Sequence, residues 1–188
     1  MNLVDKSDDK VSVPSIEDHH YFIFSNDFNP NSSADAIDFI LARNLMERRP
    51  KQIKMILNSP GGEVASAFAL IDTMKGSRIP IHTYGLGEIS SCGLMTFIAG
   101  QKGHRYITRN TAILSHQFSW GSHGKEHELF AIVKEFSNTQ QRIVDHYKRC
   151  TGMKEADIKK YLLPAEDVWL TAKEAVKFGI ADHVVDFY

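Results

Sequence analysis

The sequence predicts an α/β fold, because apolar residues spaced as in strands alternate along the chain with apolar residues spaced as in helices. Two short turns carry this pattern, at residues 57–62 and 87–93. Each turn is built from small residues, follows an apolar run of strand character and precedes a helical pattern. Strand-to-helix turns of this kind expose backbone N–H groups to a negative charge, so we expect them to carry the chemistry.

The other elements follow the same two spacings. An apolar stripe from Ile37 to Leu45 predicts a helix that ends before Pro50, with a weak capping signal from Ser32 and Asp35. We expect strands over residues 21–24, 53–57, 80–84, 104–108, 111–115 and 180–185, helices over residues 64–74 and 94–99, and a last helix capped by Thr171 and closed by Gly179.

Residues 126–150 predict one long helix whose apolar residues cover more than one side. Such a helix needs a second surface against which its additional apolar residues are buried. That surface belongs either to the same domain or to another subunit, and we favour another subunit. The main stripe consists of Leu129, Val133, Phe136, Gln140, Ile143 and Tyr147, and the apolar residues off it are Phe130, Ile132 and Val144.

Composition limits the class of protein. A chain of 188 residues with 43% hydrophobic residues can form one domain with a substantial core. The formal net charge of −1 gives no reason to expect nucleic acid or a membrane surface as a partner. No apolar run reaches the ~18 residues of a membrane span, and no secretory signal is visible. Two cysteines, Cys92 and Cys150, make no disulfide framework, so the expected compartment is the cytoplasm.

Residues 1–17 are polar and are expected to form a flexible arm ahead of a single domain over residues 18–188.

The second turn also offers a nucleophile. Ser91 lies at or near a helix start, where free N–H groups and the helix dipole favour a developing anion. The turn is not the hydrolase pattern G-x-S-x-G, because Ile89 stands at the first Gly position. On this turn alone, Ser90 or Ser91 as a simple helix cap is the commoner interpretation. His116, at the end of an apolar strand, is placed to act as a base, although a lone His there is more often structural.

Four motifs in one order resemble the proteolytic subunit of the Clp protease, in the family of serine peptidases with the Clp/crotonase fold. Residues 58–62 (NSPGG) are similar to that family's oxyanion loop, and residues 87–93 (GEISSCG) to its nucleophile turn. His116-Gln117 is similar to its base, and the segment 167–182 to its acid-bearing segment. The resemblance runs from about residue 21 to residue 185.

The resemblance implies a role for each of five residues. Ser91 would be the nucleophile, His116 the general base, and Asp167 the acid that orients His116. The backbone N–H groups of Gly62 and Cys92 would form the oxyanion hole. These roles agree with the chemistry, because a serine hydroxyl needs an adjacent base and that base needs a third group to fix its tautomer.

The resemblance also implies the architecture and the assembly. The fold would be a spiral of ββα units, as in Clp peptidases and crotonases, with residues 126–150 as the handle helix between rings and the N-terminal arm either lining an axial pore or removed as a propeptide. The activity would be that of a serine endopeptidase cleaving peptides and unfolded proteins inside a homo-oligomeric ring, with rings expected to stack. A separate AAA+ unfoldase would supply ATP-driven unfolding, because the chain has no phosphate-binding G-x-x-x-x-G-K-[ST] loop. No cofactor and no metal are expected in this chain.

Two positions depart from the family pattern. Phe118 stands where the family usually has Pro after His-Gln, which is expected to alter the substrate groove. Glu166 stands where the family often has an Arg that pairs across the ring interface, which weakens the expectation of that contact.

Several alternatives remain at this stage. Asp182 is the rival acid, and Cys92 the rival nucleophile, since only one of two adjacent helical residues can face His116. His123-Gly124-Lys125-Glu126-His127 matches the zinc signature H-x-x-E-H, but its first half lies in a Gly-containing loop rather than on the helix the motif requires. A catalytically inactive ring subunit and a crotonase-like acyl-CoA enzyme would share the fold.

Overall fold

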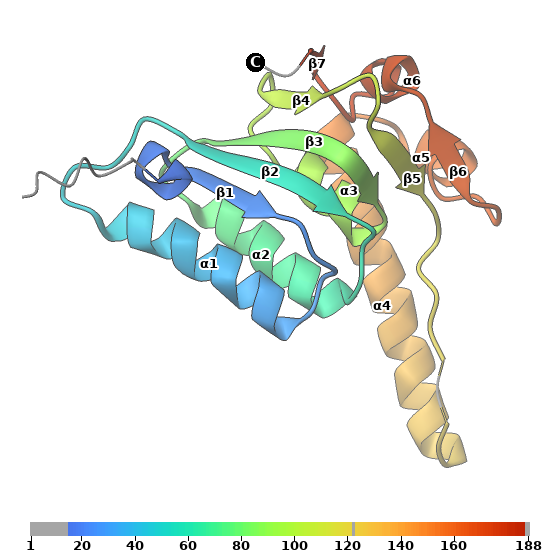
Figure 1. Ribbon diagram of the computed structural model, residues 1–188. Helices are drawn as coiled ribbons and strands as arrows, with labels where there is room; N and C mark the ends of the chain where they lie inside the picture. The colour runs from blue at the N-terminus through green and yellow to red at the C-terminus, as the bar shows by residue number, and fades with distance from the viewer. Residues whose placement is uncertain (1–14, 122, 187–188) are drawn as a thin grey trace, which may run out of the picture.

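A branched, largely parallel β-sheet forms the centre of the molecule (Figure 1). The computed structural model describes residues 15–121 and 123–186. Its sheet runs in the order β1 (Tyr21–Phe24), β2 (Ile53–Ser59), β3 (Ile81–Ser90), β4 (Arg105–Ile107) and β7 (His183–Val184), with β5 (Ala112–Ser115) paired to β3 and β6 (Val168–Leu170) paired to β5. Within the described chain all these pairs are parallel except β5–β6. The first half of β3 pairs with β4 and its second half with β5, so β3 is the strand at which the sheet branches.

Helices cover the sheet and extend beyond it. In Figure 1, α1 and α2 lie side by side along the β1–β2–β3 part of the sheet, and α4 projects away from the body. The helices are η1 (Ile16–His19, a short 3-10 helix), α1 (Pro30–Leu45), α2 (Val64–Gly76), α3 (Cys92–Ile98), α4 (Glu126–Thr151), α5 (Glu155–Tyr161) and α6 (Ala172–Lys177).

The predicted α/β class is confirmed, and most elements lie within a few residues of their expected positions. Three elements were not predicted, the short helix η1, α5 and the antiparallel strand β6. The cap of α1 also differs, because Asn29 rather than Ser32 accepts from the first free N–H groups, while Ser32 Oγ accepts from Asn29 N–H. The predicted cap of α6 by Thr171 and Glu174 forms as a reciprocal capping box.

The second turn is shorter than predicted, because β3 continues to Ser90. The register between β2 and β3 shifts near the end of the two strands, so β3 carries a bulge. Gly87 lies at this bulge with φ +66°, and Asn58 Oδ1 accepts from the N–H of Glu88 at 3.1 Å. A Cβ on Gly87 would lie only 2.6 Å from that same oxygen, so the bulge requires glycine. The bulge carries the end of β3 from β4 to β5 and places Ser91 between strand and helix.

The two halves of α4 lie in different surroundings. The C-terminal half is buried against the body through residues such as Ile143 and Tyr147. The N-terminal half leaves Leu129, Phe130 and Val133 exposed, Phe130 to 68%. The two-sided pattern of the predicted helix therefore corresponds to one buried half and one half that the described residues leave largely exposed.

The predicted arm over residues 1–17 lies mostly outside the described residues. Its last residues are described, and Ser15 caps η1 with a reciprocal bond to Asp18. Across the described residues, no helix is long and apolar enough to cross a lipid bilayer.

Candidate active site

Ser91 occupies a strained position between β3 and α3. Its φ of +54° lies in the left-handed region, which residues other than glycine adopt at a cost and which often marks functional turns. Its N–H donates to Leu114 O on β5 at 3.0 Å, and its carbonyl accepts from Met95 N–H in α3. Its neighbour Ser90 is fully buried and donates its hydroxyl to Glu88 Oε1 at 2.7 Å. Of the two serines, only Ser91 is partly exposed.

The loop Gly61-Gly62 lies directly against Ser91. A Cβ on Gly61 would lie 2.7 Å from Ser91 Cβ, so these two backbones approach as closely as glycine allows. On the other side, Phe28 N–H donates to Gly61 O at 2.7 Å and Phe28 O accepts from Glu63 N–H at 2.7 Å. Because the peptide bond is trans, a Gly61 carbonyl aimed at Phe28 directs the Gly62 N–H to the opposite side. Gly62 N–H therefore takes no part in the Phe28 bridge.

Cys92 supplies the second N–H expected at this site. It is the first residue of α3, so its N–H has no partner within the helix. Its side chain is buried, and burial raises the pKa of the thiol to about 11, although contacts with the Ser91 side chain and the Gly62 backbone oppose the shift. A thiol with this pKa stays protonated at neutral pH, which argues against Cys92 as the nucleophile.

His116 and Asp167 lie at the same end of the sheet as Ser91. Ser91 follows β3, His116 follows β5, and Asp167 precedes β6, which runs antiparallel to β5. Continuing the Ser115–Val168 pair by one residue places His116 opposite Asp167. The three residues thus flank the ends of three adjacent strands, with His116 next to the middle one. Hydrogen bonds hold this middle strand to the segment before β6, from Ser115 Oγ to Leu162 O at 2.6 Å and from Gln117 Nε2 to Leu163 O at 3.0 Å.

The three side chains are neighbours in strand order but are not joined. Among the described residues, the structure records no hydrogen bond from the His116 ring to Ser91 or to Asp167. Hydrogen bonds between such groups are often long without substrate and shorten in the substrate complex.

Asp182, the rival acid, has another role. Its carboxylate forms a two-point ion pair with Arg105, at 2.6 Å and 2.8 Å, and accepts from the backbone N–H groups of Gly103 and Arg105. Burial would raise the pKa of Asp182, but Arg105 and these N–H groups outweigh it and lower the pKa. Arg105 is only 1% exposed, so Asp182 serves as its counter-ion within the fold.

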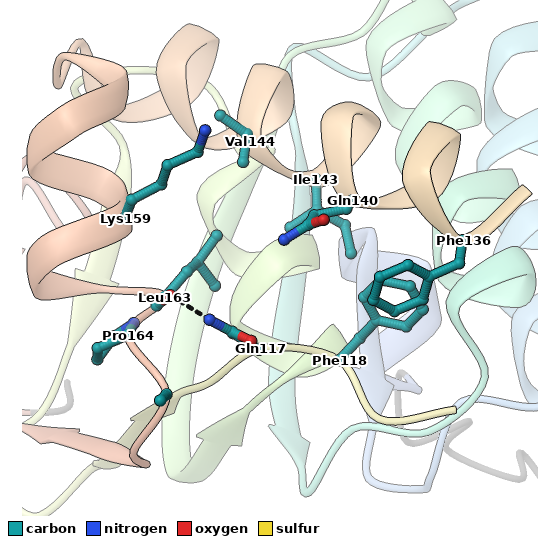
Figure 2. Close-up of a pocket in the computed structure, with 10 residues that line it drawn as sticks. Gln117, Phe118, Phe136, Gln140, Ile143, Val144, Lys159, Leu163 and Pro164 are labelled. Atoms are coloured by element: carbon teal, nitrogen blue, oxygen red, sulfur yellow. Dashed lines mark hydrogen bonds between the residues drawn. The ribbon is translucent and has the colours of Figure 1, made fainter. Parts of the chain in front are cut away.

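A mainly apolar pocket lies beside the proposed base and acid (Figure 2). It has a volume of about 330 Å³ and lies between the segment after His116, the middle of α4 and the segment before Asp167. At one end Phe118 stacks on Phe136 of α4, with ring centroids 4.8 Å apart. Phe118, the residue that stands where the family usually has Pro, therefore forms part of the wall of this pocket. Its lining residues are Gln117, Phe118, Phe136, Gln140, Ile143, Val144, Lys159, Leu163, Pro164 and Ala165.

The zinc-like motif does not lie on one helix. α4 begins at Glu126, so His123 stands outside it, whereas Glu126 and His127 are in its first turn. Within residues 15–121 and 123–186, no group of His, Cys, Asp and Glu side chains is arranged to hold a metal ion.

Comparison with known protein families identifies the fold. The family model for Clp protease matches residues 15–187. The chain belongs to the Clp protease family. Members of this family are typically serine peptidases, and the mostly parallel sheet with its long α4 agrees with the Clp/crotonase fold that the sequence motifs predicted.

Some contributors to the site have no sequence signal. Phe28, which holds the Gly61-Gly62 loop through its backbone, precedes α1 and belongs to no motif. Arg105 occupies a strand and pairs with a residue 77 positions away, so spacing along the chain does not indicate the pair. Backbone pairing and distant ion pairs of this kind depend on the tertiary fold.

Proposed function

We propose that this chain is a serine endopeptidase in which Ser91 is the nucleophile, His116 the general base and Asp167 the group that orients His116. The supporting observation is the order of the three strands, which brings one residue of each type to the same end of the sheet with the base in the middle. The burial of Ser90 and the Arg105–Asp182 ion pair support this choice over the nearest rivals.

The proposed reaction is acyl transfer to Ser91 followed by hydrolysis. His116 removes the proton from Ser91 Oγ as this oxygen attacks the substrate carbonyl carbon, and the carbonyl oxygen becomes an anion. The N–H groups of Gly62 and Cys92 stabilise that anion. His116 then gives its proton to the leaving amine, and water releases the acyl group by the same steps. Asp167 keeps the His116 ring in the required tautomer.

The apolar pocket supports a peptide substrate. Its lining includes Gln117, which follows His116, and Ala165, which precedes Asp167 by two residues. Its walls are mainly aromatic and aliphatic, with Gln117 and Gln140 among the few polar groups. We propose that it receives an apolar substrate side chain adjacent to the bond that is cleaved, because burying such a side chain contributes about 1.5–3 kcal/mol.

The exposed half of α4 supports a homo-oligomeric ring that stacks on a second ring. Leu129, Phe130 and Val133 would be covered by such contacts, and their burial outweighs the loss of the family's Arg at Glu166, since an exposed ion pair contributes under ~1 kcal/mol.

We propose that an AAA+ unfoldase feeds the ring and uses ATP, while this chain needs no cofactor. The free thiols of Cys92 and Cys150 agree with the reducing cytoplasm as its compartment.

A catalytically inactive ring subunit is the second candidate. The observation that favours it is that, among the described residues, the His116 ring makes no hydrogen bond to Ser91 or Asp167. Hydrolysis of a short fluorogenic peptide by the purified particle separates the two functions. We expect Ser91→Ala to lower turnover roughly 10⁴-fold or more with the particle mass unchanged. Ser90→Ala is the matched control and should retain activity. A fully active Ser91→Ala variant would refute the nucleophile, and an inactive wild-type particle would favour the second candidate.

Asp167→Asn tests the third member in the same assay. The amide keeps the shape but favours the wrong tautomer of His116, so turnover should fall by roughly 10⁴-fold. Glu166→Gln, the adjacent carboxylate, is the control and should have little effect. An unchanged rate for Asp167→Asn would remove the orienting role from this residue.

A further inference from the structure

The side chain of Cys92 connects the two elements that carry the proposed oxyanion donors. Its Sγ lies 3.3 Å from the carbonyl oxygen of Gly62, a residue 30 positions earlier in the chain. Cys92 begins α3 directly after Ser91, whereas Gly62 belongs to the loop before α2. One thiol thus joins the helix that follows the nucleophile to the loop that faces it.

The Gly61-Gly62 loop is held from two sides, and the Cys92 thiol supplies one of them. Both glycines have positive φ, +110° and +138°, and two glycines in succession have unusual freedom to rotate. Phe28 holds one side of the loop through Gly61 O and Glu63 N–H. On the other side, toward Ser91, the bond to the Gly62 carbonyl comes from Cys92.

The geometry of an extended residue relates the Gly62 carbonyl to its N–H. Gly62 forms a parallel bridge with Phe28, and in that arrangement the N–H and C=O of a bridging residue point to the same side, away from its partner. The contact from Cys92 to the Gly62 carbonyl therefore holds Gly62 from the side opposite to Phe28, the side toward which the Gly62 N–H also points. An oxyanion donor contributes fully only when it is held in place before the reaction.

The chemical state of the thiol suits a donor. Cys92 is 1% exposed, and burial keeps the thiol protonated, so it can donate to a carbonyl oxygen. A buried, protonated thiol is also a poor nucleophile, so this role does not compete with that of Ser91.

We propose that the Cys92 side chain is a positioning group of the oxyanion hole, whose S–H holds the Gly62 carbonyl and thereby aims the Gly62 N–H at the anion formed on Ser91. Cys92 thus contributes twice, with its backbone N–H as a donor and with its thiol through Gly62. This inference rests on the proposed serine peptidase function.

Two matched pairs of variants separate hydrogen bonding from packing. Cys92→Val and Cys92→Thr have the same shape, and only Thr carries a donor; Cys92→Ala and Cys92→Ser form a smaller pair with the same contrast. We expect kcat for a short peptide to be about 10-fold lower for Cys92→Val than for Cys92→Thr, and about 10-fold lower for Cys92→Ala than for Cys92→Ser. KM should stay within about 2-fold in each pair. The rate of inactivation by a serine-directed phosphonate should fall in parallel, because its oxygen uses the same two N–H groups. Cys150→Ala is the control for loss of a thiol elsewhere.

The outcomes distinguish this inference from the function on which it rests. Equal kcat within both pairs would refute the positioning role, because packing alone would then explain any common loss. A parallel rise in KM with kcat unchanged would also refute it. If one pair fails to assemble, the other still gives the comparison. A wild-type particle that neither cleaves peptides nor reacts with the phosphonate would refute the proposed function, and this inference with it.

Discussion

The two halves of α4 differ in burial, although both contain large apolar residues. Toward its C-terminus the helix is part of the core, with Tyr147 only 2% exposed and its hydroxyl 3.2 Å from Ser115 Oγ. Toward its N-terminus the helix leaves the body, and Phe130 is 68% exposed. Both halves contain large apolar residues, so amphipathicity alone does not reveal which residues stabilise this chain. Burial shows that the C-terminal half stabilises the fold, whereas the N-terminal half is available for the association proposed above.

The largest expected difference concerns a pair of aromatic residues on this helix. Tyr147→Ala should lower the free energy of unfolding by about 3–5 kcal/mol, because it leaves a cavity and removes the partner of Ser115. Phe130→Ala should change the stability of the subunit by less than about 0.5 kcal/mol. Urea unfolding at one fixed protein concentration, with the particle dissociated beforehand, measures both. Similar losses for the two variants would contradict the division of the helix.

A smaller change in the free energy of unfolding is expected when the pH is lowered, because His146 lies in the buried half of α4. Burial lowers the pKa of His146 to about 4; the bond to Met95 O opposes the shift, and the charges of Lys75 and Arg149 add to it. Lys75 Nζ lies 3.1 Å from Nδ1 and Met95 O lies 2.8 Å from Nε2, so a neutral ring links α2, α4 and α3.

The sign of this effect follows from the two pKa values of His146. The unfolded chain, with an ordinary His pKa near 6.5, binds the proton more readily than the folded chain. The stability is therefore complete above about pH 6.5 and decreases as pH falls toward 4, by about 3 kcal/mol in total. Denaturation curves at several pH values check this, with His146→Gln expected to lose most of the dependence and exposed His123→Gln to keep it. A smaller dependence of the same sign remains from His82, whose pKa burial also lowers. An unchanged slope in His146→Gln would assign the dependence to other groups.

The smallest expected effect per residue concerns association through the exposed half. Phe130→Ser should weaken assembly by about 1.5–3 kcal/mol per subunit, because an apolar contact in the proposed interface is lost. Sedimentation over a dilution series measures the shift in dissociation concentration. Lys134→Ser, on the same half of the helix, is the control. A wild-type species near the 21.3 kDa chain mass that still hydrolyses peptides would contradict the interface.

The sequence predicted those parts of the fold that depend on local spacing. The apolar alternation of residues 53–57 and the helical stripe after Val64 were sufficient because each pattern is long enough to show its period. The strand β6 has three residues and α5 seven, which is short for a clear period, and α5 lacks the side-chain cap that marks the similarly short α6. The bulge in β3 arises from a side-chain contact with Asn58, which spacing along β3 does not reveal.

The candidate site was predicted by its motifs rather than by its periodicity. The motifs place Ser91, His116 and Asp167 on three turns, and the strand order then brings those turns together. The motifs do not include Phe28 or the thiol of Cys92, because these act through backbone groups of other residues. Their contributions depend on which peptide groups face one another, and only the folded chain determines that.

The stack of Phe118 on Phe136 gives the proposed base a thermodynamic connection to the exposed half of α4. Two residues after His116, Phe118 packs on α4, the helix whose exposed half the proposed association would cover. If association shifts the position of His116, reciprocity requires that a ligand which holds His116 against Ser91 shifts association by the same factor. A serine-directed inhibitor is therefore expected to change the concentration at which the particle dissociates, although it contacts no residue of the interface.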